Sequence, residues 1–239
     1  MDSLEIQLLQ AIFQGKLALV ESLLAQGANP NIYGTISPRQ VALSERGNTP
    51  LMWAADEGFA AMAIALLDAG AEIDARNAAN YTALMYATES GRVDVIELLL
   101  ARGAAVDGRN ACRETELAIS ARQGLTDVLP QFLERGADLH ATNYIDDTAL
   151  YLAAENGHLY AVKLLIDRGA SVNTCNRGGW TPLMMAAARG DLEIIELLLQ
   201  HGADFTPHNN WGATALSEAQ KSFRARQAAA LLIAAGARA

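Results

Sequence analysis

Apolar residues in this chain recur at the three- and four-residue spacing of amphipathic helices. The segment DLEIIELLLQHG, residues 191–202, is the clearest case, with Asp191 at its positive N-terminal end and Gly202 as a left-handed stop. Its broad apolar face is formed by Ile194, Ile195, Leu197, Leu198 and Leu199. This pattern predicts a helix that buries one face against a neighbouring element.

The preceding segment, WTPLMMAAARG at residues 180–190, predicts a shorter partner helix. Thr181 is suited to cap it, Pro182 to occupy its first position, where a missing N–H costs nothing, and Gly190 to end it. Its alanines are small enough to let neighbouring helices approach closely. The next residues, ADFTPHNNWG, are rich in Asn and Gly and predict a turn that projects to the following unit.

This pattern returns at a fixed period of 33 residues. The period is read from Thr49, Thr82, Thr115, Thr148, Thr181 and Thr214. A glycine column with the same period consists of Gly58, Gly91, Gly124, Gly157 and Gly190. A fixed period of this length predicts a solenoid, in which each unit is too small to bury its own apolar face and buries it on its neighbours.

The T-P-L start of the first helix, the G-A-D segment after the second, and the period of 33 together resemble the ankyrin repeat. The resemblance covers essentially the whole chain. It implies an all-α solenoid of antiparallel helix pairs, with β-hairpin or turn loops at right angles to them. It also implies a concave face that in this family usually binds proteins.

We therefore expect one ankyrin-repeat domain over residues 1–239, with about seven repeats. The expected units are an N-terminal cap at 1–47, repeats at 48–80, 81–113, 114–146, 147–179 and 180–212, and a C-terminal cap at 213–239. The first cap contains an extended loop at about 32–46, roughly ten residues longer than the loop between Gly70 and Thr82. This loop is either functional or a lid that seals the N-terminal cap.

Two departures from the family pattern lead to structural expectations. In the family a histidine follows T-P-L, but no repeat of this chain has one at that position. The column instead contains Met52, Met85, Ala118, Tyr151, Met184 and Ser217. We expect the methionines of this column to fill the core. Pro130 falls inside a second-helix pattern, so that helix should begin late or bend.

The composition narrows the range of partners. The net charge of −9 and the pI near 4.9 argue against a nucleic-acid surface and favour a partner that is basic or neutral, although ordinary solubilising surface explains the charge equally. The chain lacks a long apolar run or a basic leader, so we expect no membrane contact. Two widely spaced cysteines, Cys112 and Cys175, favour a reducing compartment, so we expect the protein to be cytoplasmic. We also expect it to be a monomer.

Catalytic chemistry is not indicated by any motif. The four histidines occupy different columns without metal-ligand spacing, and no phosphate-binding loop or nucleophile motif occurs. We therefore expect no catalytic residue, metal or cofactor. An enzyme or enzyme subunit remains the alternative, with a site in the loop Tyr33–Glu45 or at Asp56, Glu57 and Glu89.

Positions that the repeat leaves free are the candidate binding residues, because the resemblance places them on the partner-binding side. The loop tips present Tyr81, Glu114, Tyr144, Ile145, Asp147, Arg177, Trp180 and Trp211. The ends of the first helices present Asp56, Glu57, Glu89, Arg122, Glu155 and Arg189. Exposed aromatic residues dominate binding energy when a partner buries them. Trp180 could instead pack on the next loop, which makes Trp211 the better candidate.

The function that follows is a non-catalytic scaffold that binds a partner protein, with a basic patch on the partner facing the acidic N-terminal half. A narrower version, by analogy, is a bacterial inhibitor of a toxin or effector enzyme. Self-assembly is a further alternative if the alanine-rich end LLIAAGARA leaves apolar area uncovered.

Overall fold

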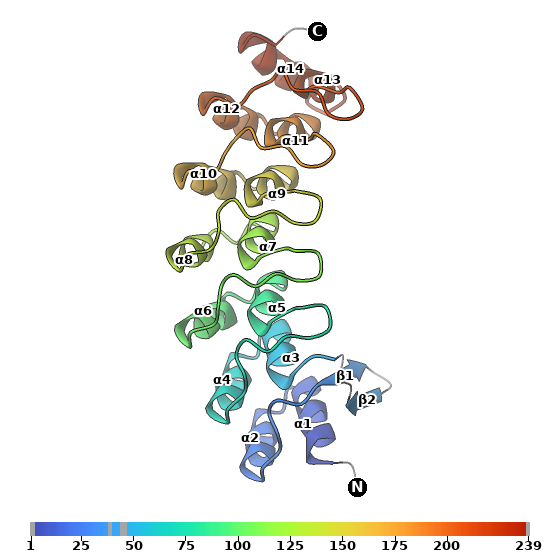
Figure 1. Ribbon diagram of the computed structural model, residues 1–239, viewed down its shortest axis with the longest axis vertical. Coiled ribbons are helices and arrows are strands. Elements are labelled where there is room, and N and C mark those ends of the chain that lie inside the picture. Colours follow the sequence, from blue (N-terminus) through green and yellow to red (C-terminus); the bar gives the residue numbers. More distant parts are fainter. Residues whose placement is uncertain (1–2, 38–39, 44–46, 238–239) are drawn as a thin grey trace. The chain divides into compact units, whose positions relative to one another are not determined.

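A computed structural model describes residues 3–37, 40–43 and 47–237 of the chain. Parts of two predicted segments lie outside these residues, namely 38–39 and 44–46 of the extended loop and 238–239 of the C-terminal cap. The chain divides into two compact units, Met1–Ala111 and Cys112–Ala239, and each is described by itself. Helices in both units are short and arranged in consecutive pairs (Figure 1).

The first unit contains three helix pairs among its described residues. They are α1 (Leu4–Phe13) with α2 (Leu17–Ala25), α3 (Pro50–Glu57) with α4 (Ala60–Asp68), and α5 (Ala83–Glu89) with α6 (Val93–Ala101). First helices pack on first helices, α1 on α3 and α3 on α5, while α2, α4 and α6 form a second layer. The core therefore lies within each pair and between successive pairs, as the repeat pattern predicts.

The extended loop of the first unit folds as an antiparallel β-hairpin. Strand β1 (Gly34–Ser37) pairs with β2 (Gln40–Leu43) and both contact α1. Gly34 and Asn48 exchange two backbone hydrogen bonds, of 3.0 and 2.9 Å, at the base of the hairpin. A Cβ atom on Gly47 would collide with the Gly34 carbonyl oxygen, so this close approach requires glycine. The position of this insertion was predicted from its length, but its strands were not.

The second unit repeats the same arrangement. Its pairs are α7 (Glu116–Gln123) with α8 (Leu129–Glu134), α9 (Ala149–Asn156) with α10 (Leu159–Asp167), α11 (Pro182–Arg189) with α12 (Leu192–Gln200), and α13 (Ala215–Ala219) with α14 (Ala225–Ala234). The first helices α7, α9, α11 and α13 pack in that order. Ile194, Ile195 and Leu198 are buried as predicted, whereas Leu197 and Leu199 are only half-buried.

Threonine caps start the first helices, as the 33-residue period predicts. In α11, the Thr181 hydroxyl accepts a 3.2 Å hydrogen bond from the Met184 N–H, and Gly190 ends the helix with φ of 73°. Equivalent caps are formed by Thr49, Thr82, Thr115, Thr148 and Thr214. Each cap satisfies an N–H that has no partner inside its helix, so the repeat fixes where these helices begin.

Two further expectations about the helices are confirmed. Helix α8 begins at Leu129 and has six residues, so Pro130 lies in its first turn, where a proline removes no helical hydrogen bond. The equivalent second helix α10 has nine residues. Met52, Met85 and Met184 are fully buried, so the methionine column fills the core.

Candidate functional site

Asparagine side chains shape the loop tips that precede the capping threonines. In the second unit, the Asn176 side-chain oxygen accepts hydrogen bonds from the N–H groups of Gly178 at 2.9 Å and Trp180 at 3.0 Å. The same two-bond pattern is made by Asn77, Asn143 and Asn209. A side chain that bonds its own turn in this way holds the tip residues in a fixed orientation.

Successive tips of the second unit are joined through their backbones. The Tyr144 N–H donates to Cys112 O at 3.0 Å, Arg177 N–H to Ile145 O at 2.9 Å, and Asn210 N–H to Gly178 O at 2.9 Å. We call residues 144–146, 177–180 and 210–212 the tip row. Because each loop is tied to the next, side chains of the tip row form one ordered surface.

Two tryptophans of the tip row lie side by side. The ring centroids of Trp180 and Trp211 are 6.4 Å apart and their planes are inclined at 48°. Trp180 is half-buried and packs against a cluster that includes Tyr151 and Leu152 of α9, whereas Trp211 is 74% exposed. The packing alternative considered for Trp180 therefore applies in part, and Trp211 remains open for contact.

Other predicted tip residues differ in how far they are available. Tyr144 is 51% exposed and its neighbour Ile145 is also exposed. In the first unit, Tyr81 is half-buried and packs on Tyr86 with ring centroids 5.0 Å apart. Tyr144 is thus an open aromatic position, while much of the Tyr81 ring is already covered by its own unit.

The expectation that Asp147 presents its side chain at a tip is wrong. Asp147 is only 4% exposed, and its carboxylate accepts hydrogen bonds from Asn176 at 2.8 Å and Asn143 at 3.0 Å. A buried carboxylate needs such donors to offset its lost hydration. Asp147 therefore ties two loops together, which its sequence position beside exposed tip residues did not indicate.

The arginines of this surface are engaged with acids of the second unit. Arg177 Nε lies 3.0 Å from Asp146, Arg189 Nε lies 2.6 Å from Asp191, and Arg122 Nε lies 3.6 Å from Glu114. Asp191 occupies the cap position of α12 but makes no capping hydrogen bond; its carboxylate accepts from Arg189 instead. The positive charges predicted at the ends of the first helices, those of Arg122 and Arg189, are therefore each close to a negative charge.

Glu155, near the end of α9, lies between these arginines. Burial raises the pKa of its carboxyl group, the charge of Asp147 raises it further, and Arg122 and Arg189 oppose the shift. Burial, together with Glu155 and Asp147, also raises the pKa of the Tyr151 phenol. The carboxylate of Glu155 makes no hydrogen bond or ion pair with any residue that the structure describes. Its charge is therefore not matched by a dedicated partner.

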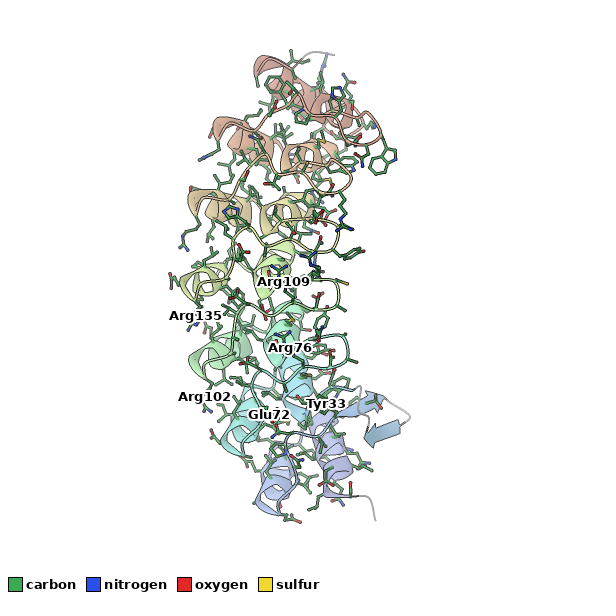
Figure 2. The ribbon with its side chains drawn as sticks, viewed as in Figure 1. Tyr33, Glu72, Arg76, Arg102, Arg109 and Arg135 are labelled. Carbon is green, nitrogen blue, oxygen red and sulfur yellow. The ribbon has the colours of Figure 1, made fainter. Side chains whose placement is uncertain are left out.

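The helix ends of the first unit are more acidic. Asp56 accepts a 2.5 Å hydrogen bond from the Ser90 hydroxyl, Glu57 is exposed and Glu89 is half-buried. One arginine lies among them, since Arg92 Nε donates a 2.9 Å hydrogen bond to the carbonyl oxygen of Asp56. Arg76, labelled in Figure 2, instead reaches from its loop to the carbonyl oxygen of Arg109 at 3.5 Å. The predicted acidic character of these helix ends thus persists in the folded unit.

Sequence reasoning missed the exposed aromatic residues Phe13, Tyr160 and Phe223. Tyr160 on α10 is 76% exposed. The residues at the same place in other second helices are Ala61, Asp94, Asp127 and Glu193. A large aromatic residue in a column of small and acidic ones is the signal that could have found it.

Within the described ranges, no group of three or more His, Cys, Asp or Glu side chains is placed to hold a metal ion. A pocket of about 480 Å³ beside α13 is lined by residues that include Phe205, Leu216 and His208, and His208 is the one titratable group in that lining. Both cysteines are exposed, and neither forms a disulfide bond. None of the described helices has the length and apolar character needed to cross a membrane.

Comparisons with known proteins give one family and one close architecture. A family model described as "Ankyrin repeats (3 copies)" matches residues 8–110, 117–209 and 173–239. Among solved structures, the human ASB11 ankyrin repeat domain is similar, with 28% sequence identity and a TM-score of 0.81 over 97% of this chain and 99% of that chain. The comparison with curated proteins gave no match. The matched ranges include nearly all of the candidate surface residues.

Proposed function

Because the chain belongs to the ankyrin-repeat family, we propose that it is a non-catalytic scaffold that binds a partner protein through its loop tips and the adjoining ends of its first helices. The family assignment and the all-α repeat fold predicted from the sequence are confirmed by the family match and the structural similarity. Ankyrin repeats are general modules for protein interaction. The surface that this chain uses, its single-domain organisation and its repeat number are part of the proposal.

The observation that carries the proposal is the exposed aromatic residue Trp211 at a rigid tip. Its backbone N–H is held by Asn209 at 3.0 Å, and its ring lies beside Trp180. A preorganised aromatic side chain loses little conformational entropy on binding and buries a large apolar area. Together with Tyr144 and Ile145 it supplies the kind of anchor that dominates protein interfaces.

The acidic ends of the first helices in the first unit favour a partner protein with a basic patch. In the first unit Asp56, Glu57 and Glu89 favour a partner with a basic patch, and the net charge of −9 opposes a nucleic-acid ligand. In this proposal the chain is a cytoplasmic monomer before it binds. Sedimentation at several protein concentrations tests the monomer, since an increase in mass with concentration would contradict it.

Affinity capture with matched variants tests the proposed surface. The intact chain is immobilised and exposed to an extract of the native cells, alongside Trp211→Ala and Tyr160→Ala. Tyr160 is the matched control because it is an equally exposed aromatic residue on α10, away from the tips. We expect a partner that is retained by the wild type and Tyr160→Ala and lost with Trp211→Ala. Equal recovery by all three proteins would contradict the role of the tips.

A further inference from the structure

Glu155 and the indole rings of the tip row are connected through Tyr151 of α9, which interacts electrostatically with Glu155 and packs against Trp180. Glu155 follows Tyr151 and Leu152 by one helical turn on α9, so all three share one helix face. Trp180 packs against Tyr151 and Leu152, and Trp211 extends the aromatic surface from there. An acidic group and an aromatic surface therefore border the same residue, Tyr151.

The charge at this place is unbalanced. Arg122, Arg177 and Arg189 each have an acid of their own, namely Glu114, Asp146 and Asp191. Glu155 has no such partner among the described residues, and the buried Asp147 behind it adds further negative potential. A ligand with negative charge would be repelled here, whereas a cation would supply the missing partner.

The aromatic faces are also free of the chain's own cations. The cation–π contact found within the described residues is that of Arg224 over Phe223, at 5.2 Å, which lies outside the tip row. The guanidinium of Arg177, the arginine nearest in sequence to Trp180, is held by Asp146. The indole surface of Trp180 and Trp211 can therefore receive a cation from another molecule.

We propose that Glu155, Trp180 and Trp211 bind a basic side chain of the partner protein, with arginine preferred over lysine. The aliphatic part of such a side chain would lie on the indole rings while its charged head pairs with the carboxylate. Arginine fits better because its planar guanidinium stacks on aromatic rings and pairs with a carboxylate through two hydrogen bonds. This inference rests on the proposed function, since it assigns the chemistry of the partner at the same surface.

Selection of short random peptides displayed on phage, with the intact chain as bait, tests this inference. Peptides whose binding is lost with Trp211→Ala are sequenced and synthesised with arginine, lysine or citrulline at the enriched position; citrulline has the shape of arginine without its charge. Their affinities are measured by fluorescence anisotropy for the wild type, Glu155→Gln and Glu193→Gln. Glu193→Gln is the matched control because it removes the same charge from an exposed position on α12.

We expect arginine to be enriched, and its replacement by citrulline to weaken binding to the wild type and Glu193→Gln by at least about tenfold. For Glu155→Gln the same replacement should change the affinity by less than about twofold, because the carboxylate that pairs with arginine is gone. Glu155→Lys should reverse the preference and select acidic peptides. A purely structural role of Glu155 would not produce that reversal. Circular dichroism and urea unfolding establish that each variant is folded.

The two proposals fail in different ways. Peptides that depend on Trp211 but carry no enriched basic residue, or that show no coupling to Glu155, would overturn this inference and leave the scaffold function in place. A selection that yields no Trp211-dependent peptide would contradict the proposed binding surface, and this inference with it.

Discussion

The side-chain amide of Asn176 donates a 2.8 Å hydrogen bond to the carboxylate of Asp147, and so joins two loops of the second unit. The first unit contains the corresponding bond, in which Asn77 donates to the Asn48 side chain at 2.7 Å. In both cases the donor asparagine also accepts hydrogen bonds from its own loop. These side chains therefore strengthen the connection between loops that form no regular sheet.

Replacing Asn176 with alanine should destabilise the second unit. The change removes the donor to the buried Asp147 and the acceptor of two backbone N–H groups. Leaving buried polar groups without partners costs about 2–4 kcal/mol in total. Urea unfolding monitored by circular dichroism should show this loss.

The adjacent residue is the control for that experiment. Arg177→Ala breaks an exposed ion pair with Asp146, which should change the free energy of unfolding by less than about 1 kcal/mol. Similar losses for Asn176→Ala and Arg177→Ala would refute the structural role assigned to Asn176.

The effect of a proline on the free energy of unfolding should depend on its position in the second helix. Pro130 in the first turn of α8 and Lys163 in the middle of α10 occupy equivalent places in their repeats. Lys163→Pro should destabilise the protein by about 3 kcal/mol or more, because it removes a helical hydrogen bond and introduces a clash. Pro130→Ala should change the free energy of unfolding by less than about 1 kcal/mol. Thermal and urea unfolding of the two variants measure these changes. Comparable losses of unfolding free energy would argue against the late start of α8.

The two tryptophans of the tip row should differ in their effect on stability. Trp180→Ala should lower the free energy of unfolding by about 1–3 kcal/mol, because that side chain is partly buried against Tyr151 and Leu152. Trp211→Ala should cost at most about 1 kcal/mol, from its contact with Trp180. Equilibrium unfolding in urea measures both changes. A larger loss for Trp211→Ala than for Trp180→Ala would mean that Trp211 is part of the core and not a free anchor.

The raised pKa of Glu155 should make its replacement stabilising at neutral pH. The group faces Asp147, Arg122 and Arg189 from neighbouring elements and Tyr151 from its own helix. A carboxyl whose pKa is raised by folding binds more protons in the folded state, so its contribution to stability falls as pH rises from the ordinary value of about 4.3 through the raised pKa. Glu155→Gln should therefore match the wild type near pH 4 and be more stable at pH 7.

Urea unfolding of Glu155→Gln and Glu193→Gln across this pH range tests the sign. The stability difference between variant and wild type should grow with pH for Glu155→Gln, and Glu193→Gln, which removes an exposed carboxylate, is the control. A difference for Glu155→Gln that shrinks as pH rises would show that the arginines outweigh burial and Asp147 at this site.

Much of the fold was predictable because it depends on local chemistry. The Thr181 cap, the Gly190 stop and the late start of α8 at Pro130 each involve residues within one helical turn. The candidate surface was only partly predictable. Asp147 and Tyr144 stand close together in one loop, yet one is buried and the other exposed.

The sequence by itself determined the repeat, the ends of its helices and the residues that fill its core, since a periodic pattern repeats the same local interactions in every unit. The tertiary structure alone decided how charge and aromatic area are distributed over the surface. Asn176 comes from a different loop to bond Asp147, and Trp180 packs on Tyr151 and Leu152 of the preceding repeat. Burial and pairing depend on distances between segments about one repeat apart, which periodicity within a single unit cannot specify.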